Sequence, residues 1–491
     1  MSNSQVHVDQ DVVIIGTGFA GLGMAIRMKN AGMESFTVFE YAGSVGGTWR
    51  DNTYPGAACD IQSHLYSFSF EPNPNWSSMY GKQEEILAYL EYCTDKYGIE
   101  PHIRFNCGVK GAEFDEPSGV WTLQLSDGST TTARTVISGT GGLSRPSVPS
   151  IEGIDDFKGE MFHSARWDHD CDLRGKRVAV IGSGASAIQI IPNIVDRVSE
   201  LHAYQRTAAW VMPKGDRPIS EREQNLYERL PITQRLFRTA LYWSLEVRAL
   251  MFVKYPKLME RIQPMAEKHL EKRVPDPELR AKLTPDYTLG CKRILLANDY
   301  YPALQRDNVD LISSGIERIT ERGILGKDGV EREVDVIVLC TGFKAADDVA
   351  PFPVKGVGGI DLGESWREGA EAYLGTTVAG FPNMFMLVGP NTGLGHNSMV
   401  FMIESQVNYV MSALRTLRKR KLRYMDVRPD VQSRFNQNLQ TRMEGTIWMS
   451  GCTSWYQADN GKVTTLWPGF TAEYRARTMR VNPRNYNFVT T

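Results

Sequence analysis

The chain has 491 residues, of which 42% are hydrophobic and 23% charged. This length and apolar content predict two or three folded domains and exclude a largely disordered protein. The formal net charge of -2 and the sequence pI near 6.5 give no electrostatic reason to expect a nucleic-acid partner.

The cysteine pattern and the apolar stretches predict the compartment. The seven cysteines are scattered and never form a CxxC pair, so neither a disulfide framework nor a zinc site is expected. The N-terminal ten residues lack the basic head and apolar run of a signal peptide. The apolar stretch 241–255 is too short and too charged to span a bilayer. We therefore expect a cytoplasmic protein without a transmembrane segment.

The first motif is a strand, glycine turn, helix and second strand over residues 10–40. Gly16 permits the tight turn, Gly18 lets the backbone approach a pyrophosphate, and Gly21 allows close packing of helix on strand. Glu40 follows Gly16 by 24 positions (40 − 16) and is placed to accept hydrogen bonds from an adenosine ribose. The unit is suited to FAD.

A second unit of the same kind covers residues 175–207. Its turn has the GxGxxA frame, in which we expect the cofactor contacts to be Gly182, Ser183, Gly184 and Ala187. Arg206 stands 24 positions after the first glycine (206 − 182), where an acid would repel a 2′-phosphate and a guanidinium can bind one. Thr207 adds a hydroxyl donor. This unit is suited to NADPH, unless Arg206 is only a surface residue.

The two units together argue for hydride transfer from a nicotinamide to a flavin. Residues 135–142 and 334–343 each run a strand into a glycine turn and are expected to be crossings between the domains. The predicted fold class is α/β, with two Rossmann-like dinucleotide-binding domains and a helical insertion in the NADP domain. The predicted divisions are 1–145 (FAD domain, first part), 146–215 (linker and NADP domain, first part), 216–290 (helical insertion), 291–345 (NADP domain, second part) and 346–491 (FAD domain, second part).

Two later segments predict helices. The glycine-rich run before Met399 enters an apolar helical pattern and could direct N–H groups at a flavin ring. The basic run 415–423 is interpreted as the exposed face of an amphipathic helix rather than a phosphate-binding patch.

The stretch FKGEMFHSARWD, residues 157–168, looks like a catalytic cluster but lies between the two nucleotide-binding units. A metal site is disfavoured because the spacing matches no zinc motif and adjacent side chains of an extended chain point apart. The possible ligands would have been His163, Asp168, His169, Asp170 and Cys171. We interpret the stretch as a linker whose His163 and Trp167 couple domain motion to cofactor position.

The same stretch resembles the fingerprint FxGxxxHxxxW, followed by Pro or Asp, of the Baeyer–Villiger monooxygenases. The residues that match are Phe157, Gly159, His163, Trp167 and Asp168. Residues 46–70 are similar to the family's flavin-side segment and residues 291–309 to its arginine segment, so the resemblance covers nearly the whole chain. The turn GTGG at 139–142, where the family more often has ATG, is a small departure.

The resemblance implies bound FAD that is reduced by NADPH and reacts with dioxygen to a peroxyflavin, which converts a ketone into an ester or lactone. It implies that Arg293 is the catalytic arginine, Asp60 its carboxylate partner and Lys292 a second cation near the NADP 2′-phosphate. A preorganised cation would stabilise the negative charge of the reacting species. Further positions that the resemblance assigns to cofactor contacts are Gly47, Trp49, Tyr66, Val109, Met399 and Trp455.

Other interpretations stay open at this point. A heteroatom monooxygenase would use the same cofactors on sulfur or nitrogen, and Arg293 favours the ketone reaction over it. A disulfide reductase would need a redox cysteine pair beside the flavin, and an NADPH- and FAD-binding redox sensor would show no turnover. Asp60 and Arg293 could also be a structural salt bridge, and the aromatic residues could be ordinary core.

Overall fold

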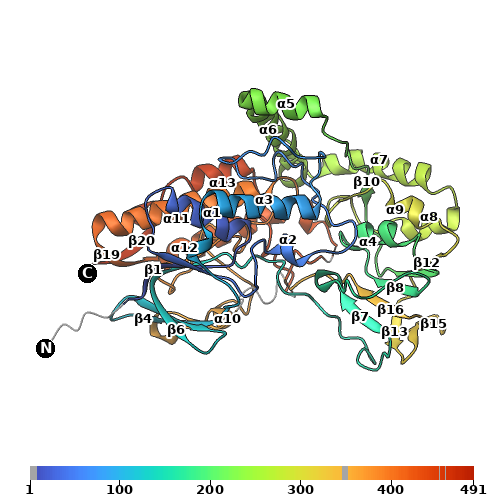
Figure 1. Ribbon diagram of the computed structural model, residues 1–491, viewed down its shortest axis with the longest axis horizontal. Coiled ribbons are helices and arrows are strands. Elements are labelled where there is room, and N and C mark those ends of the chain that lie inside the picture. Colours follow the sequence, from blue (N-terminus) through green and yellow to red (C-terminus); the bar gives the residue numbers. More distant parts are fainter. Residues whose placement is uncertain (1–7, 345–351, 453, 459, 491) are drawn as a thin grey trace.

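The computed structural model describes residues 8–344, 352–452, 454–458 and 460–490. Two sheets, each flanked by helices, lie side by side along the long axis of the molecule, the first at the left and the second at the right of Figure 1. The α/β fold with two dinucleotide-binding units is thereby confirmed.

The first sheet has the strand order β17-β4-β5-β6-β1-β2-β3, and β18 also pairs with β6. Strand β1 is central and continuously buried after its first two residues, as expected for a parallel strand covered on both faces. β4, β5 and β6 form an antiparallel meander. The strand bounds are β1 Gln10–Ile15, β2 Phe36–Phe39, β3 Ile103–Arg104, β4 Val109–Asp115, β5 Val120–Leu125, β6 Thr130–Ser138, β17 Val354–Lys355 and β18 Met384–Met386.

Helix α1 (Phe19–Lys29) is buried along most of its length because it is covered by α11 (Met399–Arg420). The remaining elements of this half are α2 Thr48–Asp51, α3 Gln83–Lys96, α10 Leu362–Ser365, α12 Pro429–Glu444, α13 Thr471–Arg477 and the hairpin β19 Leu422–Val427 with β20 Tyr486–Thr490. The basic run 415–423 therefore spans the exposed end of α11 and the start of β19, so the prediction of a single helix there is correct only to Arg420. Helix α11 ends because Lys421 takes the left-handed conformation, with φ +53°.

The second sheet is entirely parallel, with the order β12-β9-β8-β16-β7. Strands β8 and β16 are almost fully buried, as their runs of valine and isoleucine predict. Helices α4 (Ala187–Ile194) and α9 (Tyr300–Ala303) pack together beside it, and β13 to β15 form a small antiparallel sheet. The strand bounds are β7 Glu160–His163, β8 Arg177–Ile181, β9 Glu200–Tyr204, β12 Val309–Ile312, β13 Ile316–Ile319, β14 Gly323–Gly326, β15 Glu331–Glu333 and β16 Val336–Leu339.

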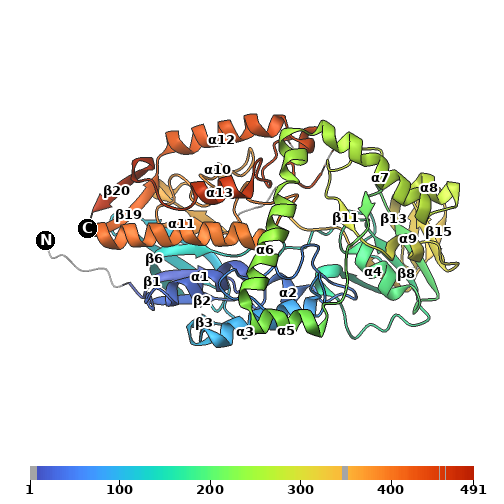
Figure 2. The same ribbon diagram turned by 90° about the horizontal axis from the view of Figure 1, so that it is seen from above.

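The segment between β10 (Val211–Met212) and its partner β11 (Leu295–Leu296) is helical. It comprises α5 Glu221–Arg229, α6 Pro231–Glu246, a π-helical turn at Leu250–Lys254, α7 Lys257–Arg273 and α8 Pro277–Leu283. Figure 2 shows α6 crossing the molecule between its two halves. The helix contacts the first half, since Tyr242 stacks on Phe401 of α11 with ring centroids 4.7 Å apart.

The two chain crossings between the sheets pair with each other. Ser147 donates its N–H to the Gly342 carbonyl at 2.9 Å, and Lys344 donates to the Arg145 carbonyl at 3.0 Å. The two halves are thus joined by a short two-stranded connection rather than by two independent linkers. Within the described ranges, no helix is both long and apolar enough to cross a membrane.

The expectation that the cysteines form no disulfide is wrong. Cys291 and Cys452 are bonded, with their Cα atoms 6.2 Å apart, and they stand 161 positions apart in the sequence. A pair so distant along the chain has no spacing motif, and only the fold brings the two residues together. The other five cysteines are free.

Candidate functional site

The first glycine turn leaves its backbone open to a ligand. Gly16 has φ +93°, and a Cβ on Gly21 would lie 1.8 Å from the Gly16 carbonyl oxygen. Gly47 has φ +53°, and a Cβ there would lie 2.9 Å from the Gly18 Cα. Two stretches of bare backbone therefore face each other at the N-terminus of α1, an arrangement that suits the pyrophosphate of FAD.

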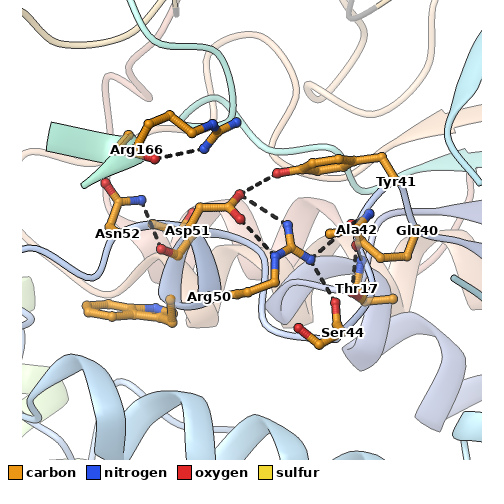
Figure 3. Close-up of polar contacts among 12 residues, drawn as sticks. Thr17, Glu40, Tyr41, Ala42, Ser44, Arg50, Asp51, Asn52 and Arg166 are labelled. Carbon is orange, nitrogen blue, oxygen red and sulfur yellow. Dashed lines mark hydrogen bonds and ion pairs between the residues drawn. The ribbon is translucent and has the colours of Figure 1, made fainter. Parts of the chain in front are cut away.

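Glu40 closes the end of β2 in a buried network (Figure 3). Its Oε2 accepts hydrogen bonds from the Thr17 N–H at 2.9 Å and hydroxyl at 2.6 Å. Its Oε1 accepts from the Ala42 N–H and pairs with the Arg50 guanidinium, both at 3.0 Å. These contacts occupy both carboxylate oxygens, so a ribose hydroxyl that binds Glu40 has to replace or share one of them. Arg50 is the contact most easily replaced, because its long side chain can move aside.

Arg50 is held from its other side. Its Nε donates to Asp51 Oδ1 at 2.8 Å, and Tyr41 donates its hydroxyl to Asp51 Oδ2 at 2.6 Å (Figure 3). The guanidinium also lies over the Tyr41 ring, 4.9 Å from its centroid. Arg50 and Thr17 were not predicted from the sequence, in which their only signal is that they lie beside the predicted glycines.

The aromatic residues expected beside the flavin lie together. Trp49 of α2 donates its Nε1 proton to the Tyr66 hydroxyl at 3.3 Å, and the two rings meet edge to face with centroids 5.7 Å apart. Val109 is the first residue of β4 and Met399 the first of α11. Both are half-buried, and Met399 lies in the first turn of its helix, where backbone N–H groups have no partner within the helix.

The second glycine turn follows β8. Gly182 has φ +126°, and a Cβ there would lie 2.3 Å from the Cys340 carbonyl oxygen. Ser183 donates its hydroxyl to the Thr207 carbonyl at 2.7 Å, which joins the turn to the residue after Arg206. Gly184 is exposed with open space where a Cβ would be, and Ala187 begins α4 fully buried. This geometry suits a second dinucleotide.

Arg206 and Lys292 gather beside that turn. Burial lowers the pKa of Lys292; the charge of Asp286 opposes this decrease and the charge of Arg206 adds to it. Lys292 Nζ lies over the Tyr287 ring, 4.7 Å from its centroid. Two cations that repel each other in the free protein are stabilised when an anion binds between them, so the pair fits the 2′-phosphate of NADPH.

Asp60 and Arg293 form an ion pair across 233 positions of the sequence. Arg293 Nε donates to Asp60 Oδ2 at 2.9 Å, and a second nitrogen of the guanidinium donates to the same oxygen. The attraction of Asp60 is the main cause that raises the pKa of Arg293. Both side chains are about a third exposed, 33% and 32%, so the pair lies at an opening rather than in a sealed core.

Tyr456 is a site residue that the sequence-based analysis missed. Its side chain is buried and its hydroxyl has no hydrogen-bond partner in the described part of the chain. Burial raises the pKa of the Tyr456 hydroxyl to about 12, and the charge of Arg293 opposes that increase, so the hydroxyl lies in the field of the ion pair. The adjacent Trp455, which had been predicted, is 49% exposed and its ring contacts that of Tyr456.

The predicted linker fingerprint forms the edge of the second sheet. A Cβ on Gly159 would lie 2.5 Å from both the Asp335 carbonyl oxygen and the Phe157 ring. His163 ends β7, accepts the Ala165 N–H at its Nδ1 and meets the ring of Phe343 in the second crossing. Trp167 packs edge to face on Phe162.

The last fingerprint residue, Asp168, accepts the Asp170 N–H at 2.9 Å. His169 contacts the Thr53 hydroxyl at 2.7 Å. Across the residues that the structure describes, no cluster of His, Cys, Asp and Glu could hold a metal ion.

The two backbone cradles for dinucleotides, one on each large sheet, define the class of protein. It is a flavoprotein oxidoreductase that brings a nicotinamide cofactor to a flavin. The residues present fit FAD at the first turn and NADPH at the second.

Comparison with known proteins names the family. The flavin-binding monooxygenase-like family matches residues 9–352. A Baeyer–Villiger monooxygenase of Pseudomonas aeruginosa is 51% identical over 98% of this chain and 92% of its own, and one of Streptomyces coelicolor is 49% identical over 99% and 93%. A steroid monooxygenase bound to NADP superposes with a TM-score of 0.88 at 31% identity, covering 98% of this chain and 100% of its own. The chain belongs to the Baeyer–Villiger monooxygenases.

Proposed function

We propose that this enzyme oxidises ketones to esters or lactones with Arg293, held by Asp60, as the cation at the reacting centre. The observation that supports this assignment most is the ion pair itself, which joins the loop after α2 to the segment that enters β11. The family relationship supports the reaction, and solved neighbours include cyclohexanone monooxygenase and an OTEMO complex with FAD and NADP.

When bound, NADPH would supply the hydride and FAD would supply the flavin ring that activates oxygen. The chain supplies position and charge. Gly16, Gly18 and Gly47 let the backbone approach the flavin pyrophosphate, while Arg206 and Lys292 bind the 2′-phosphate. Arg293 keeps its proton because Asp60 raises its pKa, so it stabilises negative charge on oxygen at any physiological pH.

A fixed cation also separates the ketone reaction from oxygenation of sulfur or nitrogen. Attack on a ketone carbonyl needs an anionic oxygen nucleophile and builds negative charge on the carbonyl oxygen, and Arg293 stabilises both. A heteroatom substrate attacks a neutral, protonated oxygen electrophile and gains nothing from this charge. The ion pair therefore favours ketones as the substrate class.

The test is Arg293→Gln, assayed with a panel of cyclic, aryl and aliphatic ketones for ester formed, NADPH consumed and hydrogen peroxide released. We expect ester formation to fall by about 10²- to 10³-fold while flavin reduction by NADPH continues. Arg306→Gln is a matched control, because Arg306 also pairs with an aspartate, Asp196, but both side chains are well exposed on the surface. An ester yield unchanged in Arg293→Gln would refute the assignment.

We also propose a cytoplasmic location. The five free cysteines, four of them buried, support it, because free thiols persist under reducing conditions.

A further inference from the structure

The disulfide between Cys291 and Cys452 joins the segment of the proposed cations to the C-terminal part of the chain. Cys291 directly precedes Lys292 and Arg293 in the sequence, and its Cα lies 6.2 Å from that of Cys452, an ordinary separation for a disulfide. One bond therefore connects the segment that carries both cations to the C-terminal segment that carries Trp455.

The bond also fixes Tyr456 relative to the ion pair. Tyr456 follows Cys452 by four positions, and its buried, unpartnered hydroxyl lies in the field of Arg293 and Asp60. The backbone of Tyr456 makes hydrogen bonds within its own C-terminal segment, while its buried ring belongs to an apolar cluster that also contains Trp210 and Leu289. Thr465 donates its hydroxyl to the Tyr456 carbonyl at 3.1 Å, and the Tyr456 N–H donates to the Ser454 hydroxyl at 3.3 Å. The disulfide reaches from this turn to the arginine segment.

The two sulfurs differ in access. Cys291 is fully buried, whereas Cys452 is half-buried next to the exposed Gly451. A thiolate from solution can therefore reach the bond from the Cys452 side, and its attack there releases the Cys291 thiolate. In a compartment that keeps five other cysteines free, a disulfide is more often a reversible redox site than a permanent structural bond.

We propose that Cys291 and Cys452 form a reversible redox modification site that sets how firmly Tyr456 and Trp455 are held against the Arg293–Asp60 pair. The proposal rests on the proposed function, because its consequence is measured on ketone oxidation. In the dithiol form the two segments separate, water and oxygen reach the flavin side, and NADPH is consumed with release of hydrogen peroxide in place of ester.

The chemistry balances with a hydroperoxide as oxidant. The Cys452 thiolate attacks hydrogen peroxide and becomes a sulfenic acid with loss of hydroxide, and the Cys291 thiol then displaces water to close the bond. The sum is two thiols and one hydrogen peroxide to one disulfide and two waters. A small dithiol reverses it by two exchange steps and is itself oxidised to a cyclic disulfide. Hydrogen peroxide from uncoupled turnover would thus restore the coupled form.

The first test needs no activity. Thiols of the full-length holoenzyme, purified without reductant, are counted after denaturation and compared with a sample treated with dithiothreitol. We expect five free thiols before and seven after, and five again when the reduced protein meets hydrogen peroxide. Hydrogen exchange of peptides that contain Trp455 should be faster in the reduced protein by about tenfold. Seven thiols without reductant, or unchanged exchange on reduction, would overturn the proposal.

The second test measures ester formed per NADPH consumed. We expect reduction to lower this ratio by about threefold or more while flavin reduction by NADPH changes less than twofold. The Cys452→Ser variant should give the same ratio as the reduced parent protein, and dithiothreitol should not change it. Cys171 is a half-buried free cysteine, so the Cys171→Ser variant should give the ratios of the parent protein in both redox forms. Equal ratios in the two redox forms of the parent protein would contradict the proposal even if Cys452→Ser fails to fold.

The two proposals fail separately. If thiol count and exchange respond to dithiothreitol but no ketone in the panel gives an ester, the redox site stands and the proposed function does not. If esters form equally in both redox forms, the function stands and the control by the disulfide does not.

Discussion

Replacing Arg206 by glutamine should weaken the preference of the enzyme for NADPH over NADH. Arg206 is exposed beside the second glycine turn and acts with Lys292, whose pKa is lowered by burial and by the charge of Arg206. A charge-assisted hydrogen bond contributes about 1.5–3 kcal/mol, and exposure places Arg206 near the lower end, so the KM for NADPH should rise by about 10-fold. The KM for NADH, which carries a neutral 2′-hydroxyl, should change by less than about twofold.

The assay is steady-state NADPH and NADH oxidation with saturating ketone, supported by titration of NADP⁺ into the oxidised enzyme. Arg174→Gln is the matched control, since Arg174 is 80% exposed on the same half and pairs only locally with Asp172 among the contacts that the structure gives. An equal rise in the KM values for both coenzymes would show that Arg206 supports the fold of the turn rather than the 2′-phosphate. If neither KM value changed, the 2′-phosphate of NADPH would have to bind at another position.

Three further predictions concern the chain crossing at Phe343, the glycine turn proposed to bind FAD, and the stability of the fold. His163→Ala should lower ester formed per NADPH while anaerobic flavin reduction persists, because His163 contacts Phe343 at the crossing and not a cofactor turn; equal loss of both would refute this. Gly47→Ala should reduce the flavin content of purified protein, because its Cβ would lie 2.9 Å from Gly18, whereas Gly32→Ala, also at positive φ but in open space, should retain flavin. Burial raises the pKa of Asp426 in β19 from 3.8 to about 7, so the folded form binds the proton more tightly and stability falls as the pH rises through this interval. Asp426→Asn should therefore raise the free energy of unfolding at pH 8 by up to about 4 kcal/mol and leave it nearly unchanged below pH 4, which urea titrations at the two pH values would check.

The parts of the fold that could be predicted from the sequence are those formed by short, continuous stretches of the chain. The strand, glycine turn and helix of each dinucleotide unit occupy about 30 residues, so the roles of Gly16, Gly21 and Gly182 follow from local geometry alone. The pairing of Asp60 with Arg293 was predicted from family resemblance and not from any pattern of spacing. The structure brings the two side chains together, while their part in catalysis stays a prediction.

The parts that could not be predicted depend on segments far apart in the chain. Cys291 and Cys452 carry no mutual spacing signal, and Tyr456 is indistinguishable in sequence from a core tyrosine. Glu40 was correctly placed at the end of its strand, but its contact with Arg50 could not be foreseen, because Arg50 reaches it from a later turn. These contacts are set by tertiary packing, which local propensity does not encode.

Three long-range contacts join segments of the two halves and of the helices between β10 and β11, and together they explain why the proposed site belongs to neither half alone. Arg293 reaches Asp60, Cys291 bonds to Cys452, and Glu246 at the end of α6 accepts the Thr471 hydroxyl at 2.7 Å from α13. Glu246 is fully buried and also accepts hydrogen bonds from the Asn397 amide at 2.8 Å and the Ala472 N–H at 3.0 Å, so its carboxylate is held by several donors of the first half. The helical insertion is therefore anchored to the first half while the arginine segment leads into the second. Any movement of one half against the other must change the surroundings of Arg293, which is what a site that first receives a hydride and then oxygenates a ketone requires.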